Sequence, residues 1–208
     1  HIKAILKMPE VSERFRIAHG REWNQNDVAI MYQSFEKHLF ASLQDFTTPV
    51  PGVIETMEQL RREGIRIGST TGYTDAMMKI VQPGAAAQGY TVDCLVTPDH
   101  LPAGRPAPYM IYRNMTELAI PSVDEVVKVG DTIADIREGL NAKVCSVGVI
   151  TGSNELGLTE EEYKTMPEPE LYTLKQEVRE RMMAAGAHYV LDNIRELPDL
   201  VHNLMNKK

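Results

Sequence analysis

Short apolar runs alternate with helical stretches over most of this sequence, and this alternation most constrains its fold. Apolar, strand-like runs occur at residues 65–68, 94–96, 126–129, 144–150 and 189–191. Amphipathic stretches with helical spacing separate them, at residues 53–63, from 75 onward, at 108–118, 135–142 and 170–185, and after 191. Short strands joined by helices imply right-handed crossovers and a parallel sheet. The sequence therefore predicts an α/β fold with a doubly wound, Rossmann-like sheet that binds ligands at the carboxyl ends of its strands.

The first 46 residues show helical periodicity and no strand pattern. Apolar residues recur at helical spacing in residues 2–6 and again in residues 28–43. Residues 24–27 supply the Asn and Asp side chains that commonly cap a helix N-terminus. Residues 47–52, Thr-Thr-Pro-Val-Pro-Gly, then interrupt the helical pattern. We expect a helical domain at residues 1–48 and an α/β core at residues 49–208.

Composition excludes several classes of protein. The chain has 208 residues, 43% hydrophobic content and a formal net charge of −7, which is ordinary for a soluble globular protein. Its basic runs are no longer than Arg61-Arg62, so nucleic acid is not an expected partner. No apolar stretch approaches the roughly 20 residues of a membrane helix, and the expected location is the cytoplasm. Cys94 and Cys145 lie in apolar runs and are expected to be buried, unpaired thiols.

The first candidate site follows the run at residues 65–68. Ser69, Thr70, Thr71, Gly72, Tyr73 and Thr74 place hydroxyl groups and a flexible glycine at the carboxyl end of an expected strand. Hydroxyl donors and a close backbone approach suit a phosphoryl oxygen. The alternative is an ordinary polar loop that caps the next helix.

The second candidate site is a pair of carboxylates after the run at residues 126–129. Asp131 follows Gly130 directly, and Asp135 lies about one helical turn further along. If the helix begins near Thr132, both carboxylates converge on one volume, and such oxygen ligands suit Mg²⁺ together with a substrate phosphate. The alternative is stabilisation of the helix dipole by acidic residues in its first turn.

The third candidate is Arg105, in the constrained segment Pro-Ala-Gly-Arg-Pro at residues 102–106. A cation fixed in a loop between a strand and a helix can neutralise a phosphoryl group. An isolated exposed arginine is the alternative interpretation.

The order of hydroxyl loop, cation and carboxylate pair resembles motifs two to four of the haloacid dehalogenase superfamily. A closer resemblance, which also includes residues 150–159 and 185–190, is to the phosphonoacetaldehyde hydrolase (phosphonatase) family. It implies that Thr71 and Arg105 contact the transferring phosphoryl group, that Tyr73 lies near the substrate, and that Ser69, Thr70 and Gly72 line the site. It also implies that Asp131 ligates Mg²⁺ with help from Asp135, and that His1 matches a cap-domain histidine close to the family's Schiff-base lysine.

The resemblance implies a reaction as well. Phosphonoacetaldehyde is cleaved to acetaldehyde and phosphate because a lysine forms a Schiff base that stabilises the leaving carbanion, while an aspartate attacks phosphorus. Mg²⁺ and the phosphoryl-binding residues stabilise the charge on the phosphoryl oxygens. The family also implies a homodimer formed through the helical caps.

Two family residues have no match in this chain. The sequence contains neither the Asp-x-x-Gly-Thr nucleophile motif nor the Schiff-base lysine, which would lie just before His1. We therefore expect an N-terminal segment with the central strand to be missing and the chain as given to be inactive. The strands ending at Gly68 and Val129 would then present open edges. The alternatives are a capped phosphatase or phosphomutase acting on a phosphate ester, and a catalytically dead phosphate-binding module.

Overall fold

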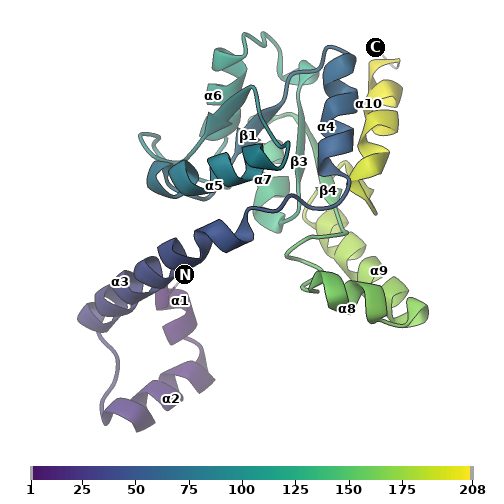
Figure 1. Ribbon diagram of the computed structural model, residues 1–208. Helices are drawn as coiled ribbons and strands as arrows, with labels where there is room; N and C mark the ends of the chain where they lie inside the picture. Colours follow the sequence, from purple (N-terminus) through teal and green to yellow (C-terminus); the bar gives the residue numbers. More distant parts are fainter. Residues whose placement is uncertain (1, 207–208) are drawn as a thin grey trace. The chain divides into compact units, whose positions relative to one another are not determined.

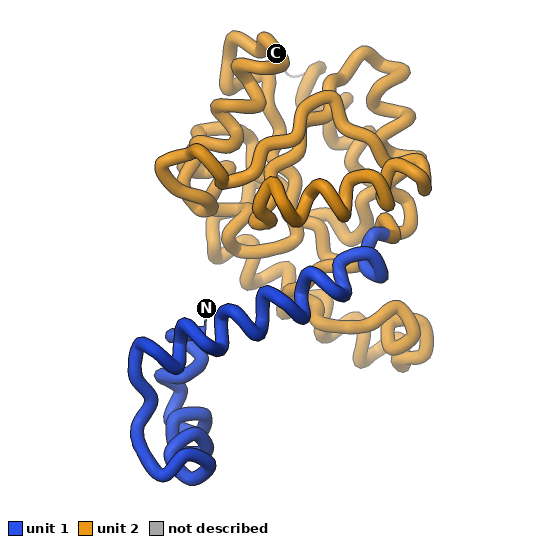
Figure 2. Tube along the Cα trace, turned by 60° about the vertical axis from the view of Figure 1, so that its left-hand side comes forward, with its two compact units in different colours: residues 1–47 blue, residues 48–208 orange. Residues whose placement is uncertain are grey.

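The computed structural model describes residues 2–206 and shows helices and strands in alternation after an all-helical start (Figure 1). The chain divides into two compact units, His1–Thr47 and Thr48–Lys208 (Figure 2). The sequence places the boundary after residue 48. We refer to these parts as unit 1 and unit 2. No helix among residues 2–206 is both long and apolar enough to cross a lipid bilayer.

Unit 1 is helical wherever regular structure is described, as predicted. Its elements are α1 (Ile2–Leu6), α2 (Pro9–His19), α3 (Gln25–Ser42) and the 3-10 helix η1 (Leu43–Phe46). Asn24 caps α3, because its side chain accepts hydrogen bonds from the Asn26 and Asp27 amides, and the Asp27 carboxylate accepts one from the Asn24 amide. Leu6 and Phe15 are buried within this unit. The predicted cap residues therefore start the long helix at the expected place.

Within residues 48–206, unit 2 contains five short strands separated by helices. The strands are β1 (Gly68–Thr70), β2 (Cys94–Val96), β3 (Val127–Gly130), β4 (Cys145–Val149) and β5 (Tyr189–Leu191). The α-helices are α4 (Val53–Arg62), α5 (Asp75–Ala87), α6 (Tyr109–Glu117), α7 (Ile133–Ala142), α8 (Glu160–Thr165), α9 (Glu168–Ala184) and α10 (Leu197–Met205). Two 3-10 turns complete it, η2 (Val123–Glu125) and η3 (Ile194–Glu196). The predicted α/β alternation is confirmed.

All strand pairs are parallel, but the described strands form two ladders. β1 pairs with β2, with Gly68 opposite Cys94, and β4 lies between β3 and β5, with Val127 opposite Cys145. In residues 2–206, β1 and β3 each pair along one edge only. The residues of β3 are all half-buried, whereas β4 is almost fully buried. The expected open edges on these two strands are therefore present.

The predicted start of the first strand was wrong. The apolar run at residues 65–68 gives way to a ladder that begins at Gly68 and includes Ser69 and Thr70. Before the ladder, Ile67 donates its amide hydrogen to the Asp93 carboxylate. Apolar side chains indicate which residues enter the core. The hydrogen bonds between strands are made by the backbone, so a strand can also include polar residues such as Ser69 and Thr70.

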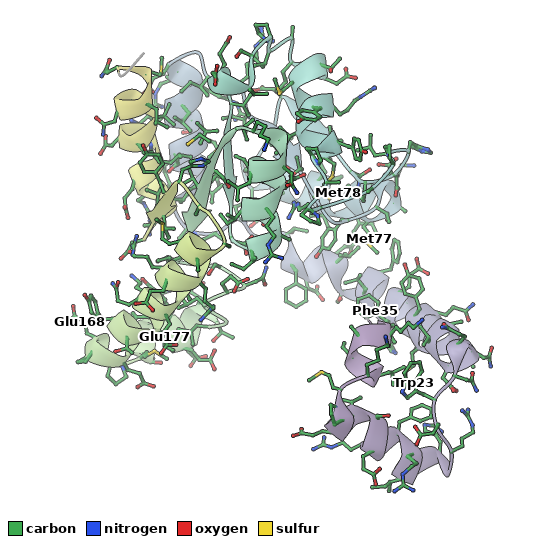
Figure 3. All side chains as sticks on the ribbon, turned by 180° about the vertical axis from the view of Figure 1, so that it is seen from behind. Trp23, Phe35, Met77, Met78, Glu168 and Glu177 are labelled. Atoms are coloured by element: carbon green, nitrogen blue, oxygen red, sulfur yellow. The ribbon has the colours of Figure 1, made fainter. Side chains whose placement is uncertain are left out.

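Helices cover both faces of the sheet, as a doubly wound fold requires. On one face, α4 and α10 lie side by side and pack Leu60 and Leu197 against Val147 of β4 (Figure 1). On the other face, α7 and α9 contribute Ile136 and Met182 to a second core cluster. Figure 3 labels Glu168 and Glu177 on α9, both of which are exposed.

The two cysteines are free, as predicted, but the prediction that they are buried was wrong. Cys94 and Cys145 are both partly exposed, and each stands at the first position of its strand. Burial raises the pKa of both thiols, and the charge of Glu117 adds to this effect at Cys94. Slow reaction with thiol reagents stays a prediction.

Candidate active site

Arg105 brings together three segments that are distant in the sequence. Its Nη1 lies 2.8 Å from Asp135 Oδ1 on α7, and its Nη2 donates to the Thr70 carbonyl oxygen on β1 at 2.6 Å. The Nη2 group also lies 3.4 Å from Thr70 Oγ1. The predicted cation, one predicted hydroxyl residue and one predicted carboxylate therefore meet in unit 2.

Two further charged residues complete this cluster. Lys128 Nζ on β3 lies 2.9 Å from Asp135 Oδ1, 3.0 Å from Glu138 Oε2 and 2.9 Å from Thr70 Oγ1. Glu138 Oε2 also accepts from Thr70 Oγ1 at 3.0 Å and lies 3.5 Å from Arg105 Nε. We call Thr70, Arg105, Lys128, Asp135 and Glu138 the ion cluster. Its two cations and two carboxylates cancel in formal charge.

Local backbone geometry places Asp135 in the ion cluster. Thr132 caps α7, and Asp135 Oδ2 accepts from the Thr132 amide at 3.3 Å and from Thr132 Oγ1 at 2.6 Å. A Cβ atom on Gly130 would lie 2.2 Å from the Asp135 Cβ, so only glycine permits this approach between strand and helix. Both oxygens of Asp135 are therefore occupied, one by cations and one by the cap.

The environment of Asp135 keeps it ionised. Burial by itself would raise the pKa of this carboxyl group, but the charges of Lys128 and Arg105 and the hydrogen bond from Thr132 outweigh burial and hold the pKa below its usual value. Asp135 is consequently a carboxylate at neutral pH, and Arg105 and Lys128 have a permanent partner.

Asp131 has different partners. Its Oδ2 accepts from the Asn154 backbone amide and from Asn154 Nδ2, both at 3.0 Å. No hydrogen bond to Asp131 Oδ1 is present in the part of the chain that the structure describes. The two carboxylates predicted to converge therefore turn to different neighbours, because buried cations hold Asp135 while the loop after β4 holds Asp131.

The donors present fit a magnesium site with a single protein carboxylate. Mg²⁺ commonly keeps several waters and uses one or two carboxylates together with substrate phosphate. Asp131 can offer Oδ1, but among residues 2–206 no group of three or more His, Cys, Asp or Glu side chains is gathered to hold a metal. Ligation of Mg²⁺ by Asp131, with Asp135 behind it, stays a prediction.

The hydroxyl loop divides between structural and available groups. Thr71 Oγ1 accepts from the Tyr73 amide at 3.0 Å, and Thr74 caps α5 by accepting from the Met77 amide. Gly72 and Tyr73 are exposed. The helix-capping alternative therefore holds for Thr74, and the proposed substrate roles of Ser69, Thr70, Thr71, Gly72 and Tyr73 stay predictions. His1 lies outside the described residues.

Sequence reasoning missed three residues at this site: Lys128, Glu138 and Asn154. A signal for the first existed, because a lysine in a Val-rich run of a parallel sheet contradicts the apolar character of such strands. Glu138 follows Asp135 by three residues and so shares its helix face. Asn154 lies in the segment 150–159 that carries the family resemblance, but no spacing rule predicted its contact with Asp131, since that contact joins two separate loops.

Comparison with known proteins adds sequence evidence. The family model of the haloacid dehalogenase-like hydrolases matches residues 7–143. A Parabacteroides distasonis protein named phosphonoacetaldehyde hydrolase is 69% identical over 207 residues, which are 100% of this chain and 78% of that protein. A Bacteroides fragilis protein of the same name is 58% identical over 208 residues, covering 100% of this chain and 79% of the relative.

A solved structure shares the fold. A phosphonoacetaldehyde hydrolase-like protein from Oleispira antarctica superposes with a TM-score of 0.92 at 30% sequence identity, covering 100% of this chain and 75% of that one.

Proposed function

Because this chain belongs to the phosphonoacetaldehyde hydrolases, a family of haloacid dehalogenase-like hydrolases, we propose that it takes part in the hydrolysis of phosphonoacetaldehyde. This reaction cleaves the carbon–phosphorus bond and yields acetaldehyde and phosphate. The observation that carries this proposal is the 69% identity along the chain to the Parabacteroides distasonis protein of that name. The meeting of Arg105, Thr70 and Asp135 supports it, since those segments correspond to the predicted motifs.

Arg105 binds phosphoryl oxygens in this proposal. Its guanidinium carries five N–H donors. Asp135 and Thr70 lie against its Nη atoms, while the Glu138 carboxylate stands 3.5 Å from Nε without a hydrogen bond. The side chain is 21% exposed, so remaining donors can reach a substrate. A planar fork fixed in this way suits the negatively charged oxygens of a phosphonate group, and it can hold them in place while the electron pair of the carbon–phosphorus bond passes to the leaving carbon.

Thr71 donates a second hydrogen bond to the phosphoryl group. Its Oγ1 already accepts from the Tyr73 amide, so its own hydroxyl hydrogen can point to a substrate oxygen. Asp131 would hold Mg²⁺ through Oδ1, and the metal, when bound, supplies additional charge stabilisation at the phosphoryl oxygens. Asn154 fixes the orientation of that carboxylate through two hydrogen bonds.

The test compares this chain with a completed version. The completed protein joins it to the residues of the Parabacteroides distasonis relative that lie outside the match, which would supply the nucleophilic aspartate and the Schiff-base lysine. Acetaldehyde is measured by NADH oxidation with alcohol dehydrogenase, and phosphate by ³¹P NMR. We expect equal release of both products from the completed protein and none from the chain as given. Borohydride added with substrate should inactivate the completed protein by reducing the Schiff base.

Two outcomes would overturn this function. Faster hydrolysis of a phosphate ester such as p-nitrophenyl phosphate than of phosphonoacetaldehyde would favour a capped phosphatase. Binding of inorganic phosphate without turnover of either substrate would favour a phosphate-binding module.

The proposal includes a cytoplasmic homodimer formed through unit 1. Exposed apolar side chains on this unit support it, among them Tyr32 and Phe35 of α3, the latter labelled in Figure 3. Phe35→Asp should convert the dimer to a monomer in light scattering after size-exclusion chromatography, whereas Lys37→Gln, a change at an exposed polar neighbour, should not.

A further inference from the structure

Glu138 is a buried carboxylate that the proposed reaction does not use. It has no exposed surface, and it lies one helical turn after Asp135 on α7. Its Oε2 contacts Thr70 Oγ1 and Lys128 Nζ, each at 3.0 Å, and Arg105 Nε at 3.5 Å. Its Oε1 is buried without a hydrogen-bond partner among the described residues.

Stability does not account for this carboxylate. A buried polar atom without a partner destabilises the folded state, and replacing buried ion pairs with apolar residues of similar volume is often neutral or stabilising. An apolar side chain at position 138 would also avoid the unpaired Oε1. The ion cluster therefore calls for a role that an apolar residue could not fill.

The geometry of Arg105 supplies such a role. Asp135 contacts Nη1 and the Thr70 carbonyl oxygen accepts from Nη2, whereas Nε makes no hydrogen bond among the described residues and has the Glu138 carboxylate 3.5 Å away. Each nitrogen of the guanidinium therefore faces an oxygen, and the one beside Nε acts through its charge. Lys128 contacts both carboxylates and Thr70, and thereby holds the two anions in place. Without Glu138, the guanidinium would keep only the two contacts of its Nη atoms and could tilt.

We propose that Glu138 is a positioning residue that, together with Lys128, fixes the guanidinium plane of Arg105 for the phosphoryl group. This proposal rests on the function proposed above. Glu138 acts through Arg105 and does not touch the substrate.

Charge and positioning make opposite predictions for Glu138→Gln. The ion cluster is formally neutral, so this substitution gives it one positive charge. If charge were decisive, inorganic phosphate would bind more tightly. If positioning is decisive, phosphate should bind roughly tenfold more weakly, because a misplaced donor loses its hydrogen-bond geometry. Binding of inorganic phosphate to this chain is measured by calorimetry. Glu125→Gln, the same charge change at an exposed position, is the matched control and should bind like wild type.

Chemical rescue by guanidinium is a measurement that would not change if Glu138 had a purely structural role. Arg105→Ala should lose phosphate binding and regain part of it when millimolar guanidinium chloride occupies the vacated position. In the Arg105→Ala, Glu138→Gln double variant, rescue should require at least tenfold more guanidinium, since one of its anchors is gone. Equal rescue in the two backgrounds would overturn the proposal.

A second variant covers the possibility that Glu138→Gln does not fold. Lys128→Met with Glu138→Met removes one cation and one carboxylate, so the ion cluster stays neutral and loses its unpaired oxygen. We expect it to fold and to bind phosphate more weakly than wild type. Wild-type affinity in this variant would refute the positioning role.

The two proposals fail in different ways. If wild type binds no phosphate and the completed protein releases no acetaldehyde, the proposed function fails and the role of Glu138 falls with it. If wild type binds phosphate and Glu138→Gln binds as Glu125→Gln does, only the role of Glu138 is refuted.

Discussion

Asp27 in unit 1 and Asp135 in unit 2 occupy the same position of a helix N-terminus, the third residue after the cap. Asn24 and Thr132 are the respective cap residues, and each aspartate carboxylate accepts a hydrogen bond from the backbone amide of its cap. Each also pairs with an arginine, Asp27 with Arg21 at 2.7 Å and Asp135 with Arg105 at 2.8 Å. The local chemistry of the two helix starts is thus nearly identical.

Their surroundings differ. Arg21 lies in the turn just before its helix, is half exposed and stands 5.6 Å from the Phe15 ring. Arg105 comes from another loop, and the Asp135 side chain is 3% exposed and also pairs with Lys128. The comparison shows that the same local motif buries an aspartate in both units. Asp27 pairs with a half-exposed arginine from the preceding turn, whereas Asp135 joins a buried ion cluster because the fold brings in distant cations.

Removing each of the two aspartates in a separate variant should give the largest difference in stability between the two helix starts. Asp135→Ala leaves Arg105 and Lys128 buried with one carboxylate between them, and breaking a buried ion pair costs about 3–5 kcal/mol. Urea unfolding measures this loss of stability, with hydrogen exchange of the β4 amides as the probe of unit 2. Asp27→Ala is the matched control, and its smaller effect on unit 1 can be followed by the emission of Trp23, the single tryptophan of the chain. Similar losses in both variants would contradict the contrast.

Replacing each arginine with lysine should give the next largest difference in stability. Arg105→Lys keeps the charge but loses the fork that spans Asp135 and Thr70, and we expect it to cost about 2 kcal/mol, since charge-assisted hydrogen bonds are lost. The same change at the half-exposed Arg21 should leave the melting of unit 1 nearly unchanged. Thermal unfolding by circular dichroism and by Trp23 emission reports on each. A larger effect at position 21 would reverse the comparison.

Acid should reveal the Arg21–Asp27 pair in unit 1. Hydrogen bonds from Arg21 and from the Asn24 amide lower the pKa of Asp27 to about 2, against an ordinary value of 3.8. Between these values the unfolded state binds more protons, so the stabilisation is complete above about pH 4 and is lost as the pH falls through about 2. We expect Asp27→Asn to unfold at a lower temperature than wild type at pH 5, and at nearly the same temperature as wild type at pH 2, as measured by Trp23 emission. A difference that persists at pH 2 would assign the effect to packing instead.

Salt should give the smallest effect. Raising NaCl from 10 mM to 500 mM shortens the screening length and weakens exposed ion pairs more than buried ones. The melting difference between wild type and Asp27→Asn should therefore shrink, while that between wild type and Asp135→Asn should hold. Equal salt sensitivity would mean that the ion cluster is more accessible to ions than its burial indicates.

The sequence by itself determined those features of the structure that depend on residues close to one another along the chain. The alternation of apolar runs and amphipathic stretches predicted the α/β order, and Asn24 predicted the start of α3, because periodicity and caps act within a few residues. The motif residues Arg105 and Asp135 were also found from spacing and resemblance. Short-range signals of this kind survive in any tertiary context that accepts the helix or strand.

Only the tertiary structure decided how these residues are used. Asp135 contacts Arg105 and Lys128, Asp131 contacts Asn154, and Glu138 joins the ion cluster, while the predicted metal role of the two aspartates stays a prediction. The start of β1 at Gly68, in place of the apolar residue 65, likewise depended on its pairing with β2. The physical reason is that buried charges choose partners by distance in space, and the distance between β1, β3 and α7 is set by the packed sheet and not by the separation of their residues along the chain.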